Sequence, residues 1–217
     1  MQILANTSDL NEASHTLANV DADWGRLIAA VGPCTFEAKT EREPYEALIR
    51  AVAYQQLHAK AADAILQKFT QLFSAATIDP LVSPKFPSPS QVIAAEFDDL
   101  RACGFSSRKV ETLIGIAQGA LTGLVPTRSD ATMMADKDLI NRLISLKGIG
   151  QWTVEMLLMF TLARIDILPA DDFAIVEGYK RLKKLAVAPK RKEMTEIAKA
   201  WRPYRTVASW YLWRVPK

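Results

Sequence analysis

The chain has 217 residues, of which 49% are hydrophobic and 24% charged, a balance typical of a folded protein with a buried core. Its cysteines, Cys34 and Cys103, and its histidines, His15 and His58, are too few for a four-cysteine cluster or a histidine-rich metal site, so a metal enzyme is not expected. The net charge is only +3, but basic residues dominate 178–217, which suits a polyanionic partner. Taken alone, a solvated helical surface is the simpler explanation of that charge.

Apolar residues recur at helical spacing along almost the whole chain, and strand alternation is nearly absent. Pro44 suits the first position of a helix, and Ser106 or Ser107 suits the cap of another. The nearest candidate for a strand is 163–170, and the Pro/Ser-rich stretch 79–90 predicts a long loop. The fold class is therefore all-α, with roughly ten helices. The predicted helical segments are 44–57, 58–73, 88–105, 106–121, 136–146, 150–165, 171–185, 190–201 and 202–214.

Two glycines, Gly148 and Gly150, separate two of these helices and predict a tight turn with Ile149 as an apolar plug. The second helix would then begin with its free N–H groups exposed, which is a ready site for an anion such as a backbone phosphate. Such a contact positions a polyanion without reading its sequence. Two spaced glycines alone fit an ordinary helical hairpin. The fuller pattern, with Leu146 before the turn and Thr153 after it, is more restrictive.

Five blocks carry a resemblance to a known family: YQQLHAKAADAI, GFSSRKVETL, LKGIGQWT, LPADDFAI and RPYRTVASWYLWR. In this order they resemble the AlkA-like 3-methyladenine DNA glycosylases of the HhH-GPD superfamily, over roughly residues 20–217. The family's Gly/Pro-rich loop is represented by ARIDILPADD, in which Pro169 is present and the glycine is missing.

The resemblance implies one domain, residues 1–217, made of two helical lobes that flank a cleft, with no N-terminal β-domain. The expected parts are lobe A at about 42–165 with the helix-hairpin-helix at 136–163, lobe B at about 18–41 plus 166–217, and a flexible start at 1–15.

Two adjacent aspartates, Asp171 and Asp172, open a predicted helix, and one plain explanation is that they cap it and favour its dipole. The family's spacing from the hairpin identifies Asp172 as the catalytic aspartate and leaves Asp171 a capping or orienting role. Cleavage of an N-glycosidic bond builds positive charge on the sugar, which a carboxylate stabilises while it orients the attacking water. Relatives that nick DNA carry a lysine where this chain has Trp152, so the resemblance implies a monofunctional enzyme that leaves an abasic site.

An enzyme that acts on a base extrudes it into a pocket, and a tryptophan face attracts a positively charged alkylated purine. The resemblance makes Trp152 and Trp213 the pocket residues, with Tyr54 as a third candidate. Core packing explains aromatic residues at helical spacing equally well, and we expect it for Trp201, Tyr204 and Trp210.

The stretch Gln55, Gln56, Leu57 and His58 is implied to be the minor-groove wedge that fills the gap left by the extruded nucleotide, with Gln56 or Leu57 as the inserted residue. The subfamily often has serine in place of His58, which either bonds a base edge or phosphate or simply caps the next helix. Two further residues are candidate phosphate contacts, Lys60 and Ser106.

The implied function is base-excision repair of double-stranded DNA containing alkylated bases, with release of 3-methyladenine or 7-methylguanine. No cofactor is expected, although hairpin carbonyls suit a monovalent cation. We expect a monomer without a membrane segment or signal peptide, cytoplasmic and nucleoid-associated in a bacterium or nuclear in a eukaryote. Three alternatives stay open: another lesion such as hypoxanthine, etheno-adenine or uracil, a non-catalytic DNA-binding scaffold, and a helical interaction domain with no role on DNA.

Overall fold

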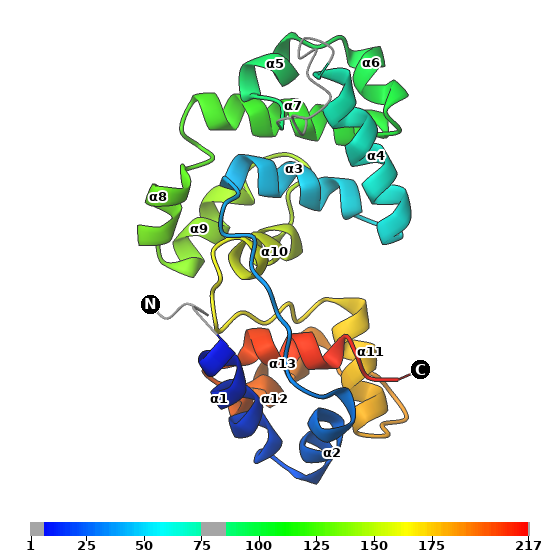
Figure 1. Cartoon of the computed structure of the whole chain (residues 1–217), viewed down its shortest axis with the longest axis vertical. Helices are drawn as coiled ribbons and strands as arrows, with labels where there is room; N and C mark the ends of the chain where they lie inside the picture. Colours follow the sequence, from blue (N-terminus) through cyan, green and yellow to red (C-terminus); the bar gives the residue numbers. More distant parts are fainter. Residues whose placement is uncertain (1–6, 75–85, 217) are drawn as a thin grey trace. The chain divides into compact units, whose positions relative to one another are not determined.

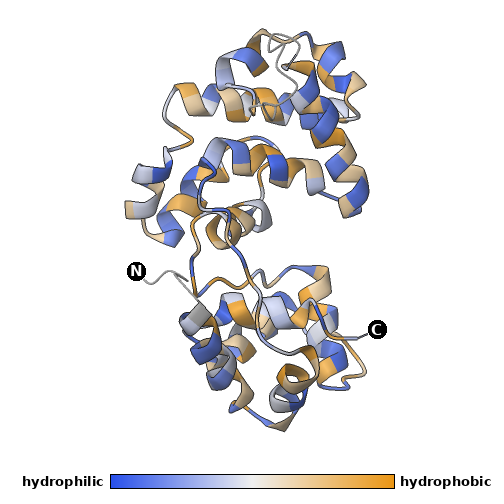
Figure 2. Cartoon of the chain, in the orientation of Figure 1, coloured by the Kyte–Doolittle hydropathy of each residue, from blue (hydrophilic) through white to orange (hydrophobic). Residues whose placement is uncertain are grey.

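The computed structural model describes residues 7–74 and 86–216, and within these ranges it contains thirteen α-helices, one 3-10 helix and no strand (Figure 1). The all-α prediction is confirmed. The chain forms two compact units: unit 1 comprises Met1–Thr40 and Leu158–Lys217, and unit 2 comprises Glu41–Leu157. Each helix carries both polar and apolar residues, as expected for helices that bury one face (Figure 2). No helix in the described ranges is long and apolar enough to cross a membrane.

Unit 2 is built around the long helix α7, against which α3, α5 and α6 pack. Its elements are α3 (Pro44–Tyr54), α4 (Ala59–Leu72), α5 (Pro89–Ala94), α6 (Phe97–Ala102), α7 (Ser107–Leu121), α8 (Arg128–Met133), α9 (Asp136–Leu143) and the first part of α10 (Gln151–Phe160). Pro44 opens α3 and Ser106 caps α7, as predicted.

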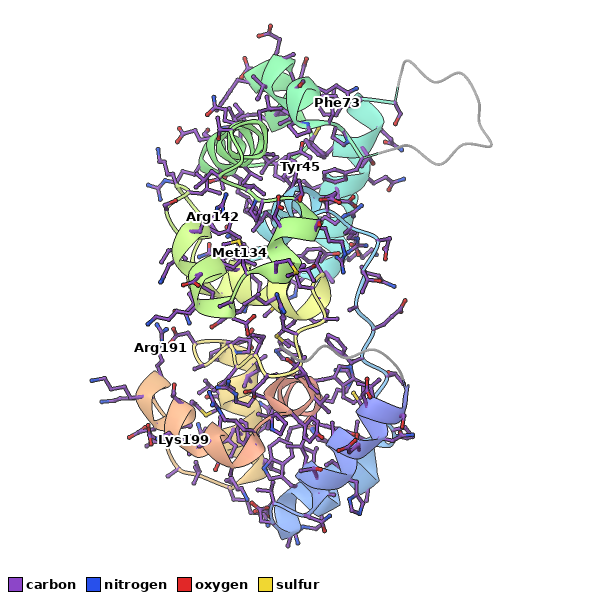
Figure 3. The ribbon with its side chains drawn as sticks, turned by 90° about the vertical axis from the view of Figure 1, so that its left-hand side faces the viewer. Tyr45, Phe73, Met134, Arg142, Arg191 and Lys199 are labelled. Atoms are coloured by element: carbon purple, nitrogen blue, oxygen red, sulfur yellow. The ribbon has the colours of Figure 1, made fainter. Side chains whose placement is uncertain are left out.

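An aromatic cluster fills one end of unit 2: the Phe69 ring lies 5.4–5.7 Å, centroid to centroid, from those of Phe73, Phe86 and Phe105. Elsewhere in the unit the Arg142 guanidinium donates to the carbonyl of Leu124 at 2.9 Å and contacts the Met134 sulfur, so it ties the chain on either side of α8 to α9 (Figure 3).

Two predictions about unit 2 were wrong in detail. Segment 88–105 is not one helix, because Ala95 and Glu96 have extended backbone angles and divide it into α5 and α6. The loop predicted at 79–90 ends earlier than expected, since Ser88 and Gln91 form a capping box that starts α5 at Pro89; its part at 79–85 lies outside the described residues. The six-residue α8 was not predicted at all.

Unit 1 surrounds α13, whose residues from Thr206 to Leu212 are all buried. Its elements are α1 (Thr7–Ala18), α2 (Ala22–Val31), the end of α10, α11 (Phe173–Leu182), α12 (Arg191–Ile197), η1 (Ala198–Trp201) and α13 (Arg205–Leu212). Trp24 and Trp201 meet edge to face with ring centroids 5.2 Å apart, and Trp210 is also buried, so Trp201 and Trp210 are core residues as predicted. The prediction was wrong for Tyr204, which is only half-buried and donates its hydroxyl to Glu12 at 2.8 Å.

The described part of segment 1–15, for which we expect flexibility, forms the beginning of α1 from Thr7. Leu10, Ala13 and Leu17 are buried at helical spacing against α2 and α13. The Tyr211 hydroxyl also donates to Ser14 Oγ at 2.9 Å, which fixes α1 on the central helix.

The candidate strand at 163–170 is instead a buried connector. Thr206 holds it from the first turn of α13: its hydroxyl donates to the Arg164 carbonyl at 2.7 Å and accepts from the Ile167 N–H at 3.1 Å. Arg205 adds an ion pair, with Nη2 2.9 Å from Asp166 Oδ2. The connector therefore delivers the chain to the start of α11 along a fixed path.

Helices α11 and α13 approach so closely at Gly178 that a Cβ there would overlap the Leu212 carbonyl oxygen. We expect Gly178→Ala to lower the free energy of unfolding by about 1–3 kcal/mol, because backbone, unlike a flexible side chain, has to move. Gly115→Ala is the matched control: a Cβ there meets no atom within 4 Å, so the substitution should stabilise α7 by about 0.5–1 kcal/mol. Urea unfolding measures both, and a neutral Gly178→Ala would contradict the close approach.

Candidate functional site

Asp172 occupies the N-cap of α11, and two donors fix its carboxylate. Oδ1 accepts a hydrogen bond from the Ile175 N–H at 2.9 Å and another from the Trp213 indole Nε1–H at 3.0 Å. The first bond fixes the carboxylate on its own helix, and the second ties it to the end of α13. The half-buried carboxylate is therefore held in one orientation.

Trp213 is itself held by an aromatic stack. Its ring lies nearly parallel to that of Phe160, with centroids 5.9 Å apart, and Phe160 packs on Phe36 at 5.2 Å. Phe36 and Phe160 were not identified from the sequence, because the three rings come from segments far apart in the chain. Only the long-range packing shows that they support the tryptophan.

The expected capping role of Asp171 was wrong, because the cap is Asp172 itself. Asp171 is exposed and pairs with Arg191 at the start of α12, with Nη1 2.9 Å from Oδ2 (Figure 3). The orienting partner of Asp172 is Trp213. Spacing along the sequence made Asp172 the candidate carboxylate but did not predict its supporting contacts.

The predicted helical hairpin is present between α9 and α10 in unit 2. Gly148 has φ +85°, and a Cβ at this position would overlap the Thr112 hydroxyl, so glycine is required for both reasons. Gly150 does not have a positive φ; its carbonyl accepts from the Thr153 N–H at 3.0 Å at the start of α10. Only Gly148 of the two glycines therefore uses the positive φ that glycine permits.

Most side chains of the hairpin motif point inward. Leu146, Ile149 and Thr153 are buried, whereas Gly148 and Gly150 are exposed. The part of the motif that faces solvent is therefore glycine backbone, which suits contact with a phosphate at the first turn of α10.

The segment between α3 and α4 contains two different kinds of residue. The Gln55 side chain points to the hairpin, donating to Thr153 Oγ1 at 3.0 Å and to the Gly148 carbonyl at 3.3 Å. Gln56 is exposed with φ +57°, and Leu57 keeps 41% of its surface exposed. His58 stands at the N-cap of α4, but its side chain makes no capping bond. His58 thus occupies the N-cap position named by the capping explanation, and its side chain remains available for the other role proposed for it.

The remaining predicted site residues lie in unit 2. Trp152 is half-buried in the first turn of α10, and Lys60 is exposed in α4. The Tyr54 hydroxyl donates to the Asp63 carboxylate; burial and this bond raise the pKa of Tyr54. Ser106 Oγ accepts from the Lys109 N–H at 3.3 Å and so serves as a helix cap.

The structure brings together two sets of predicted residues: Asp172 with Trp213 in unit 1, and Gln55 with the hairpin in unit 2. Both cysteines are buried free thiols, and burial raises the pKa of Cys34 to about 11. Within the described residues, no three His, Cys, Asp or Glu side chains gather where they could hold a metal ion.

A helical hairpin whose exposed glycine backbone precedes a helix N-terminus suits contact with a DNA phosphate. Comparison with family models agrees: residues 49–203 match the HhH-GPD superfamily of base excision DNA repair proteins. The chain belongs to this superfamily.

Two proteins of Schizosaccharomyces pombe are similar over nearly the whole chain. DNA-3-methyladenine glycosylase 1 is 42% identical over 97% of this chain and 89% of its own, and an alkylbase DNA glycosidase-like protein is 36% identical over 99% and 97%. The solved structure of the S. pombe 3-methyladenine DNA glycosylase in complex with abasic DNA superposes with a TM-score of 0.83 at 42% identity, covering 94% of this chain and 95% of that one.

Asp172 is both the N-cap of α11 and the candidate site carboxylate, so its substitution by alanine and by asparagine should affect stability differently. Asp172→Ala removes the cap of α11 and should cost about 1 kcal/mol of unfolding free energy. Asp172→Asn should leave stability nearly unchanged, because an asparagine oxygen accepts the same bonds and asparagine is an equally good N-cap. Urea unfolding compares them; an equal loss in both variants would show that the negative charge, and not the cap, stabilises the helix.

Proposed function

We propose that this protein is a monofunctional DNA-3-methyladenine glycosylase of base-excision repair, which hydrolyses the N-glycosidic bond of alkylated purines in double-stranded DNA. The observation that carries the proposal is the Asp172 carboxylate, fixed by the Ile175 N–H and the Trp213 indole. The similarity to alkylbase glycosylases over the whole chain supports it.

The chemistry needs little more than a fixed anion. As the C1′–N bond breaks, the base leaves with the bonding electron pair and positive charge develops on the sugar. The Asp172 carboxylate stabilises that charge and orients water, whose oxygen bonds to C1′ as one water proton passes to the carboxylate. Because N-alkylated purines already carry positive charge, the leaving base needs no separate proton donor.

The aromatic residues would select the base. Trp213 presents an indole ring whose N–H is already bonded to Asp172, and Trp152 is the second proposed contact, with Tyr54 as the third. A tryptophan face attracts a cationic base by about 0.5–2 kcal/mol and gives no such advantage to neutral bases. Trp152 also lacks an amine that could form a Schiff base, so the product is an unbroken strand with an abasic site.

Duplex binding would use the backbone at Gly148 and Gly150 for a phosphate, with Lys60 as a further contact and Gln56 or Leu57 inserted into the minor groove. Affinity should fall as salt rises, because phosphate contacts release counterions. We place the protein with the genomic DNA, in the nucleoid region of a bacterial cytoplasm or in a nucleus, acting as a monomer.

The direct test is release of free bases from methylated duplex DNA, identified by chromatography. Wild-type protein should release 3-methyladenine or 7-methylguanine, and Asp172→Asn should slow release by about 100-fold or more. Asp171→Asn is the matched control and should stay within about fivefold, because it loses only an exposed ion pair. Folded wild-type protein that binds duplex but releases neither base would refute the alkyl-purine proposal.

The same reactions test monofunctionality. The product strand should remain intact on a denaturing gel until alkali or heat cleaves the abasic site, because no lysine occupies the position of Trp152. Strand breaks without alkali, or a covalent adduct trapped by borohydride, would show Schiff-base chemistry from another amine.

A further inference from the structure

Three segments of unit 2 form a closed ring of contacts: the loop Gln55–His58 after α3, the hairpin Lys147–Gly150 before α10, and the first half of α7. The first link joins the loop to the hairpin. Gln55 Nε2 donates to Thr153 Oγ1 at 3.0 Å and to the Gly148 carbonyl at 3.3 Å. Because Thr153 is buried, this partner has a fixed position.

The second link joins the same loop to α7. Lys109 Nζ donates to the Ala53 carbonyl at 3.1 Å and to the Gln55 carbonyl at 2.9 Å, where α3 ends. Helix ends leave carbonyls without helical partners, and an ammonium group satisfies them well. Burial lowers the pKa of Lys109, in keeping with a lysine directed into the protein. Gln55 is therefore held through its backbone by α7 while its side chain holds the hairpin.

The third link joins α7 to the hairpin and closes the ring. Gly148 lies against Thr112, where no Cβ would fit, and Lys147 pairs with Glu111 at 2.7 Å. The exposed pair is worth little, but the glycine contact leaves the turn no freedom to shift toward α7. The loop, the hairpin and α7 thus constrain one another.

The two residues that follow Gln55 differ from it in exposure and backbone conformation. Gln56 holds a left-handed backbone with φ +57°, which is unfavourable for a residue with a side chain, and both Gln56 and Leu57 are exposed. Such a conformation persists only where neighbouring structure enforces it. The bonds made by Gln55 and Lys109 immediately before it provide that constraint.

We propose that Gln55 is a positioning residue that couples the DNA-inserting loop to the phosphate-binding hairpin, with Lys109 as its anchor. A phosphate held by the hairpin then fixes how deeply Gln56 and Leu57 enter the duplex. Phosphate contacts are the same at every step along DNA, so they give the insertion loop a constant reference position. The proposal rests on the proposed function and assigns Gln55 a role in extrusion instead of insertion by its own side chain.

The rival explanation is that Gln55 itself enters the DNA. It would then leave Thr153, and the hydroxyl of Thr153 would contribute nothing to excision. Thr153→Val removes that hydroxyl from the buried partner without changing its shape. This variant therefore separates positioning from insertion.

The experiment measures single-turnover excision on an alkylated duplex and affinity for undamaged duplex, for wild type, Gln55→Ala, Thr153→Val and the double variant. Each single variant should slow excision about three- to tenfold, as expected for loss of one hydrogen bond. The double variant should be no slower than the slower single, because both remove the same bond. Affinity should stay within about twofold, since phosphate contacts are kept. Gln67→Ala, an exposed glutamine in α4, is the control and should match wild type.

A second readout does not depend on catalysis. In a duplex with 2-aminopurine beside an abasic-site analogue, insertion of the loop unstacks the reporter and raises its fluorescence. Both single variants should give a smaller rise than wild type at saturating protein, while thermal melting confirms that each is folded. If wild type shows the rise but releases no base, the proposed function fails and the positioning role is still tested.

Three results would overturn the proposal. One is a Gln55→Ala variant that matches Gln67→Ala in both readouts. Another is normal excision and fluorescence in Thr153→Val with loss only in Gln55→Ala, which would establish insertion by Gln55. The third is multiplicative loss in the double variant, which would show that the two residues act independently.

Discussion

The hydrogen bond from the Trp213 indole to Asp172 is the interaction on which the candidate site depends, and much of unit 1 serves to place its two ends. Gly178 lets α11 and α13 approach until their backbones touch, and Thr206 fixes the buried connector that leads to α11. Phe160 supports the indole from one face. These contacts come from four separate parts of the sequence, so the carboxylate is oriented by the packing of the whole unit and not by its own loop.

In unit 2 the group held in place by packing is the exposed backbone of the hairpin instead of a carboxylate. Gly148 brings the hairpin against α7, and the Gln55 bonds join the hairpin to the end of α3. The exposed glycine backbone and the strained Gln56 therefore have defined positions within the unit. In unit 1 a glycine without room for a Cβ sets the distance between two helices, and in unit 2 such a glycine sets the distance between the hairpin turn and α7. In each unit a side-chain hydrogen bond then orients the candidate group.

The sequence predicted those features that a run of neighbouring residues encodes. Periodicity predicted most of the helices, and the motif around Gly148 predicted the hairpin. It missed α1 and α2, for which no helical segment was predicted. It also failed where the signal is short or distributed: α8 has six residues, and α5 and α6 share one apolar pattern that two extended residues interrupt. The same limit applies to the site. Spacing made Asp172 the candidate, but its indole partner Trp213 lies 41 residues away and follows from tertiary packing, which no run of neighbouring residues encodes.

The dependence of the candidate site on tertiary packing bears on the chemistry proposed for it. The proposed substrate carries its own positive charge, so the protein has no need of a reactive thiol, a metal or a separate acid to make the base leave. What it must supply is a carboxylate at a defined point and DNA held at a defined depth. Both requirements concern position and not reactivity, and position is the property that Gly178, Trp213, Gln55 and Gly148 determine. Gln55 and Gly148 were already candidates in the sequence, whereas the close approach at Gly178 and the bond from Trp213 to Asp172 follow only from the packing.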